Sequence, residues 1–222
     1  MSRWLSIDPD LKVLLPDGTT RPMSDYVWPT AILMLASLLL TLSLFTPFWS
    51  LTMKAPQYPQ GLKVTVFIDR VQGDVDEIDG LNHYLGMPSL NEGGKIERQI
   101  SVLAVGAMAL LVLAGVFIHN RWAGILALPA VIFPGVFLAD LQYILYHYGH
   151  SIDPESALGQ AIQPFTPPLL GVGHIGQFST VAEFGPGLYL TMAASLLVLV
   201  GLYFHRRAYK AVRDARKRMS RR

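Results

Sequence analysis

The chain has 222 residues, of which 51% are hydrophobic and only 15% are charged. Soluble domains usually contain about 25% charged residues, so this composition argues against a soluble enzyme. The sequence has no cysteine, which excludes disulfides, thiolate metal sites and covalently attached c-type haem. The net charge is only +2, but the charges are unevenly distributed along the chain.

Four long stretches without charged residues predict four transmembrane helices, since a helix needs about 20 apolar residues to cross a bilayer. The first stretch follows a mixed polar segment and exceeds the about 7–15 apolar residues of a signal peptide, so we expect it to be retained. The expected fold is an all-α membrane protein with two ordered extracytoplasmic loops. Its segments are an N-terminal segment (1–28), spans (29–53, 99–119, 122–147 and 187–205), loops (54–98 and 148–186) and a basic tail (206–222).

The distribution of basic residues predicts the orientation. The tail at 206–222 contains nine basic residues and one acid, whereas the loop at 148–186 contains three acids and no lysine or arginine. Basic residues near helix ends favour the cytoplasmic side. With four spans, both termini are then cytoplasmic and both long loops extracytoplasmic. We interpret the tail as a topology signal that also contacts anionic lipid headgroups, rather than as a nucleic-acid site.

The two loops contain local signals of secondary structure. Residues 63–68 (KVTVFI) are rich in β-branched side chains and predict a short β element in the first loop. In the second loop, Asp153 followed by Pro154 is typical of a helix start, so we expect a short helix at about 154–163. The segment 171–178 (GVGHIGQF) is interrupted by glycine and is expected to be a loop.

The first loop also contains a candidate metal pair. If the segment 81–87 (LNHYLGM) is helical, His83 and Met87 lie on one face at i,i+4 spacing. Imidazole and thioether together suit copper, especially Cu(I). The alternative is that Met87 packs against the membrane surface while His83 only forms a hydrogen bond.

A second group of candidates follows the third span. Asp140, Tyr143, His147 and His150 are spaced 3, 4 and 3 residues apart, which places them on one stripe of a helix. An ionisable side chain within a span is a functional candidate, although Asp140 could instead pair with Tyr143, a backbone amide or water. His147 and His150 form a second possible metal pair, and His174 is a further candidate ligand in the second loop. The predicted copper ligands are therefore His83, Met87, His147, His150 and His174.

Several loop segments resemble one family of bacterial membrane proteins. These segments are 55–62 (APQYPQGL), 81–87 (LNHYLGM), 148–150 with 153–154, and 164–168 (PFTPP). Together they resemble the NosB-like family of four-helix proteins, which is associated with nitrous oxide reductase maturation and with copper handling. The resemblance implies the bacterial inner membrane and the context of a periplasmic copper enzyme, but it implies no catalytic or ligand residue. His174 and the basic tail lie outside it.

The sequence therefore favours a non-enzymatic accessory protein of the bacterial inner membrane. It would assist assembly, copper supply or electron supply of a periplasmic metalloenzyme such as nitrous oxide reductase. Its expected partners are the lipid bilayer and other membrane or periplasmic proteins, and no nucleic acid. One alternative is a quinone-interacting membrane subunit that uses Asp140 and Tyr143. Another is a structural scaffold without any ligand.

Overall fold

Four long helices dominate the computed structural model, which describes residues 12–15, 18–120, 122–175 and 178–219. These helices are α1 (Ser24–Ser43), α3 (Lys95–Phe117), α4 (Trp122–His150) and α6 (Pro186–Met219). Each of them contains a stretch that is long enough and apolar enough to cross a membrane. The predicted four-helix, multi-pass membrane protein is therefore confirmed at this level.

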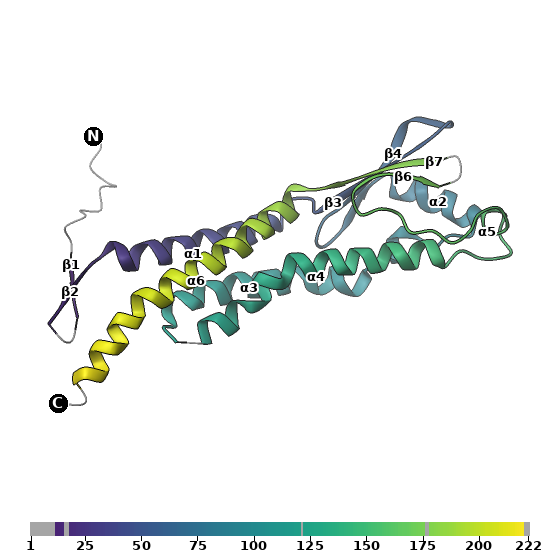
Figure 1. Cartoon of the computed structure of the whole chain (residues 1–222). Helices are drawn as coiled ribbons and strands as arrows, with labels where there is room; N and C mark the ends of the chain where they lie inside the picture. Colours follow the sequence, from purple (N-terminus) through teal and green to yellow (C-terminus); the bar gives the residue numbers. More distant parts are fainter. Residues whose placement is uncertain (1–11, 16–17, 121, 176–177, 220–222) are drawn as a thin grey trace, which may run out of the picture.

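The four helices form a bundle in which α1 packs against α6 and α3, and α4 packs against α3 and α6 (Figure 1). Hydrogen bonds between helices accompany this packing: Ser37 Oγ of α1 donates to the Ala109 carbonyl at 2.9 Å, and Ser195 Oγ of α6 donates to the Ala130 carbonyl at 2.9 Å. Small and hydroxyl side chains let membrane helices approach closely and bond to each other. The buried core of the bundle includes Leu33, Leu40, Val112, Ala127 and Val198.

Both long loops contribute strands to one antiparallel sheet at the end of the bundle (Figure 1). Its strand order is β5 (Val71–Gly73), β4 (Tyr58–Val66), β3 (Trp49–Ala55), β7 (Phe178–Phe184) and β6 (Gly171–Ile175). The central pair joins β3 of the first loop to β7 of the second, with Trp49 opposite Phe184. The start of α1 and the end of α6 lie at the opposite end of the molecule (Figure 1). The strands from the two long loops therefore lie together at one end of the bundle.

The sheet corrects the expectation of an all-α fold with a single short β element. The first span was expected at 29–53, but α1 ends at Ser43 and Trp49–Ala55 form β3. Pro47 explains the early end, because the residue before a proline is disfavoured in a helix. The strand expected at 63–68 is the second half of β4, which begins at Tyr58.

The remaining helices also differ in their bounds from the expected segments. The third span was expected to end at residue 147, but α4 continues to His150. The last span was expected at 187–205, but α6 runs on through the basic segment to Met219. The helix expected at 154–163 is shorter, since α5 comprises Ala157–Ala161 and is capped by Ser156, whose Oγ accepts from the Gly159 N–H.

The sheet is amphipathic, and its apolar face is turned toward the helices. Along β3, Trp49 and Leu51 alternate with Ser50 and Thr52, as expected for a half-buried strand. The register places Leu51 opposite Val64 of β4 and opposite Ala182 of β7, so these side chains share the inner face. This face packs against α4 in a cluster formed by Trp49, Leu141, Leu145 and Ala182.

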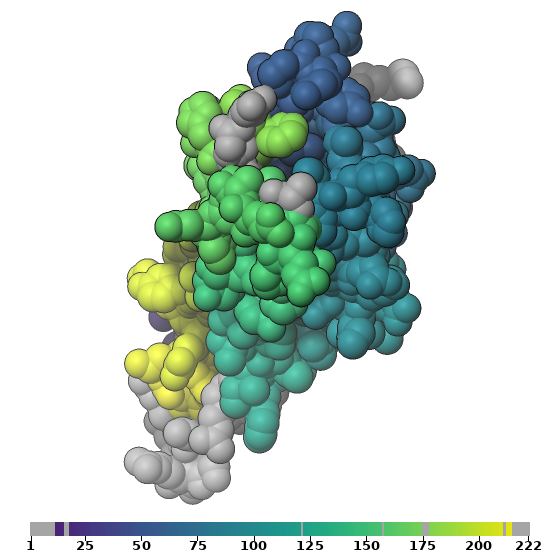
Figure 2. Space-filling model, turned by 90° about the vertical axis from the view of Figure 1, so that its right-hand side faces the viewer, coloured from purple at the N-terminus to yellow at the C-terminus, as the bar shows by residue number. Residues whose placement is uncertain are grey.

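The two loops are also joined at their outer ends. The helix α2 (Val75–Leu85) packs on the sheet and contacts α5. The Asp153 N–H donates to the Gly86 carbonyl at 2.9 Å, directly after α2. Figure 2 shows segments of the two loops side by side at this end. At the opposite end of the molecule, β1 (Lys12–Leu14) and β2 (Thr20–Pro22) form a small antiparallel hairpin before α1.

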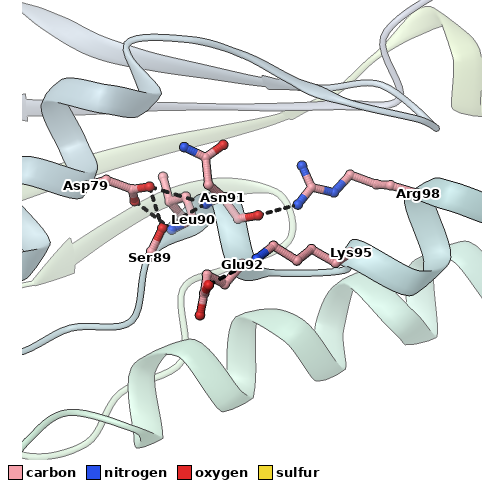
Figure 3. A network of polar contacts seen from close by, with 7 residues as sticks. All are labelled: Asp79, Ser89, Leu90, Asn91, Glu92, Lys95 and Arg98. Carbon is pink, nitrogen blue, oxygen red and sulfur yellow. Dashed lines mark hydrogen bonds and ion pairs between the residues drawn. The ribbon is translucent and has the colours of Figure 1, made fainter.

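A carboxylate on α2 fixes the path from the first loop into α3 (Figure 3). Asp79 accepts from Ser89 Oγ at 2.5 Å and from the Leu90 N–H at 2.6 Å, in and beside the 3₁₀ helix η1 (Leu90–Glu92). Arg98 of α3 then donates from Nη2 to the Asn91 carbonyl at 2.6 Å. Partial burial acts to raise the pKa of Asp79, but the hydrogen bonds from Ser89, Leu90 and Asn91 outweigh it and lower the pKa below its ordinary value of 3.8.

We expect this network to make stability depend on pH. Because the folded pKa of Asp79 is lowered, its contribution is complete above the unfolded pKa and is lost as pH falls through the folded pKa. The thermal unfolding midpoint should therefore fall between about pH 5 and pH 2, and less steeply in Asp79→Asn. The control is Asp76→Asn, which changes an exposed acid on the same helix. Equal slopes in wild type and Asp79→Asn would contradict the assignment.

Candidate functional site

A cavity of about 500 Å³ lies between the inner face of the sheet and the helices α3 and α4. Ligand-binding pockets typically enclose about 300–1,000 Å³ and are mostly apolar. Strands β3, β4 and β7 contribute the side toward the sheet, and α2 with the segment 165–167 closes another side. The lining is almost entirely apolar and includes Trp49, Met53, Val64, Phe137, Ile144 and Phe165.

The cavity is elongated and reaches from the sheet into the part of the helices that crosses the membrane. On α4 its lining extends from Phe133 to Tyr148, which is about 22 Å at 1.5 Å per residue. On α3 the lining extends from Glu97 to Met108, or about 16 Å. A molecule in this cavity would therefore contact both bilayer-depth residues and the extramembrane sheet.

A few polar groups lie among the apolar side chains of the cavity wall. Asp140 lines it from α4, and Glu97 and Arg98 line it from the first turn of α3. Arg98 donates hydrogen bonds to the carbonyls of Asn91 and Gly94. Asp140, by contrast, makes no hydrogen bond or ion pair to the described residues. On the sheet, Thr180 is only 1% exposed, and its Oγ1 has no hydrogen-bond partner in the described part of the chain.

The stripe expected on the third span is only partly brought to the cavity. Asp140 lines it, but Tyr143, His147 and His150 are exposed and are not part of its wall. The Tyr143 and His147 rings are stacked with centroids 6.2 Å apart. His150 stacks on Tyr146 at 3.9 Å, and its Nδ1 lies 2.8 Å from the Tyr146 carbonyl oxygen. Tyr143 is therefore placed apart from Asp140, outside the space that a cavity ligand could occupy.

The expected helical pairing of His83 and Met87 is wrong. The helix α2 ends at Leu85 because Gly86 adopts a left-handed conformation with φ of 72°, a common helix terminator. The Met87 N–H then donates to the Asn82 carbonyl at 2.9 Å, and Met87 turns into the cavity wall. His83 stays exposed on α2, with its ring beside Tyr84. The two side chains consequently face different surroundings.

The fifth candidate ligand lies on another surface. His174 is exposed on β6, opposite Ser179 in the register, while its neighbours Gly173 and Thr180 pair on the inner face. Within the described residues, no group of three or more histidine, aspartate or glutamate side chains could hold a metal ion. Copper binding by the five candidates stays a prediction.

The buried hydroxyl of Thr180 was missed at the level of sequence, although a signal for its strand exists. In Phe178–Phe184 (FSTVAEF), the alternate residues Phe178, Thr180, Ala182 and Phe184 have the period-two spacing of a strand. Glycines before this segment favoured a loop instead. Nothing in the local pattern indicates that Thr180 faces a cavity, because the opposite wall comes from α3 and α4.

A scan against protein-family models and a search of curated proteins found no match to this chain. The resemblance of the loop segments to NosB-like proteins therefore stays an expectation.

Proposed function

We propose that this chain is a non-enzymatic accessory protein of a cell membrane that holds one apolar molecule from the bilayer in its cavity. The observation that supports the proposal most is the apolar lining, which continues from membrane-crossing helices to an extramembrane sheet. An empty apolar cavity loses the packing contacts of its wall, so occupancy by a hydrocarbon is favoured. The protein would keep such a molecule accessible to a partner at the membrane surface.

The proposed setting is the bacterial inner membrane, with the sheet on the extracytoplasmic side and both termini in the cytoplasm. The basic segment that continues α6 supports this orientation through the preference of basic residues for the cytoplasmic side. A periplasmic metalloenzyme is the proposed partner, in keeping with the resemblance to NosB-like proteins. Assembly or electron supply would then use the molecule held in the cavity.

Copper supply is a second candidate, favoured by the way the two loops join. The hydrogen bond between the Asp153 N–H and the Gly86 carbonyl ties the end of α2 to the segment after α4. Exposed His83 on α2 and exposed His147 and His150 on α4 consequently belong to one extramembrane region. Neutral imidazoles there could capture Cu(I) for transfer to a partner.

Native mass spectrometry of the protein, purified separately in two mild detergents, tests both candidates. We expect one non-covalent apolar adduct per chain, which organic solvent extracts. Addition of Cu(I) to the same preparation should add copper to wild type and not to the variant in which His83, His147 and His150 are alanine. A protein without any adduct in either detergent would remove the ligand-holding role. Equal copper uptake by wild type and variant would remove the copper role.

A further inference from the structure

We infer that a groove at the end of the bundle opposite the sheet binds one phospholipid whose headgroup carries a single negative charge. The phosphodiester lies between Arg21 and Arg207, and an acyl chain runs along Trp28, Ile32 and Phe204. The groove and the cavity lie at opposite ends of the molecule (Figure 1), so this inference is independent of the proposed function.

The groove is formed by β2, the first turns of α1 and the part of α6 that approaches the basic segment. Beside it, the rings of Tyr26 of α1 and Tyr209 of α6 meet edge to face with centroids 5.4 Å apart, which joins the two helices there. The exposed side chains in its wall are Arg21, Asp25, Trp28, Phe204 and Arg207. A ligand can therefore reach these side chains without a rearrangement of the protein.

The polarity of the groove changes along its length in the order that a phospholipid requires. On α1 its wall extends from Ser24 to Ile32, which is about 12 Å at 1.5 Å per residue. The start of α1 lies beside the end of α6 (Figure 1), so the polar residues of both helices share one end of the groove. Trp28 and Ile32, which are i,i+4 neighbours, lie toward the membrane-crossing part of α1.

The charges in the wall match a single negative charge. Arg21 and Arg207 contribute two cations and Asp25 one anion, so the net charge of the wall is +1. Neither guanidinium group forms an ion pair or a hydrogen bond with the described residues. A guanidinium group can donate two parallel hydrogen bonds to phosphate oxygens. One phosphodiester would neutralise the groove, whereas Asp25 would repel the second negative charge of a phosphomonoester.

The apolar part of the wall favours a lipid over a free phosphate compound. Trp28 is 68% exposed and Phe204 is 43% exposed, directly beside the arginine side chains. Tryptophan is enriched where membrane helices meet the headgroup region. A soluble phosphodiester would leave this apolar surface uncovered, while an acyl chain attached to the same phosphate would cover it.

Native mass spectrometry of the full-length protein in mild detergent can test the site with phosphatidylglycerol, phosphatidic acid and phosphatidylethanolamine. We expect one phosphatidylglycerol per chain at saturation, bound more tightly than the other two lipids. Arg21→Gln and Arg207→Gln should each weaken it about 10-fold or more through loss of a charged hydrogen-bonding group. The matched control is Arg206→Gln, because Arg206 is exposed on the same helix but is not part of the groove wall. It should retain the wild-type affinity.

Two further measurements test the charge of the headgroup and the place of the acyl chain. Asp25→Asn should strengthen binding of phosphatidic acid, because it removes the carboxylate that repels a second negative charge. In lipid nanodiscs, phosphatidylglycerol with brominated acyl chains should quench tryptophan emission in wild type, and this quenching should be smaller in Trp28→Phe and in Arg207→Gln.

Four outcomes would overturn the inference. If Arg206→Gln weakens phosphatidylglycerol as much as Arg207→Gln does, the lipid is attracted by the basic segment as a whole. If phosphatidylethanolamine binds to wild type as tightly as phosphatidylglycerol, the groove does not select a single negative charge. If glycerophosphoglycerol, which has no acyl chains, displaces the lipid at equal concentration, the ligand is a soluble phosphodiester. If Trp28→Phe leaves the quenching unchanged, the chain lies elsewhere.

Discussion

Replacement of Ala104 by tryptophan should lower the amount of bound apolar ligand at least about tenfold. Ala104 lines the cavity from α3, between Ser101 and Met108. Because Ala104 is part of the cavity wall, an indole at this position would fill space that the ligand needs. Native mass spectrometry would measure the loss as the ratio of the protein with adduct to the protein without it.

The matched control for this variant is Ala107→Trp. Ala107 lies on the same helix, is exposed and is not part of the cavity wall. The same large side chain there should leave the adduct at its wild-type level, because it projects away from the cavity. If both variants lose the adduct equally, the molecule binds elsewhere on α3 and the cavity is not the site.

Gly86→Ala should destabilise the extramembrane domain by about 2–5 kcal/mol. One part is the left-handed conformation, which costs a residue with a Cβ about 1–2 kcal/mol, and Gly86 has φ of 72°. The other part is overpacking of about 1–3 kcal/mol, since the new Cβ would overlap the Ser156 side chain. Thermal unfolding followed by tryptophan emission should show a lower midpoint.

Gly80→Ala provides the opposite control on the same helix. Gly80 lies inside α2, and a Cβ there would meet no atom within 4 Å. Alanine should therefore stabilise the domain by about 0.5–1 kcal/mol, because glycine loses more conformational entropy in a helix. A stabilising effect of Gly86→Ala would show that the junction of the two loops does not constrain this position.

The four spans could be predicted from sequence because each contains a long run without charged residues. The same criterion placed Trp49–Met53 in a helix, since the segment is also uncharged. Its alternation of Trp49, Leu51 and Met53 with Ser50 and Thr52 is the period of a strand. Absence of charge alone does not distinguish a membrane helix from a strand that covers a membrane surface.

The candidate site was predictable only where one side chain is unusual by itself. Asp140 could be identified as a candidate because placing a carboxylate within a membrane span costs free energy. Thr180 could not be identified in this way, because its position in the cavity wall depends on how β7 packs against helices far away in the sequence. The pairing of His83 with Met87 failed at a single residue, Gly86, whose left-handed conformation ends α2. Histidine spacing predicts a shared face only as far as the helix continues.

The pairing of β3 with β7 also imposes an order on biosynthesis. Trp49 pairs with Phe184, and at about 5–20 residues per second the ribosome needs roughly 7 to 27 s to make the chain between them. Until β7 is made, the edge of β3 that faces β7 in the finished sheet has no partner. Such an edge can pair with other chains. A chain halted before β7 would therefore keep this edge of β3 open, and the finished chain closes it.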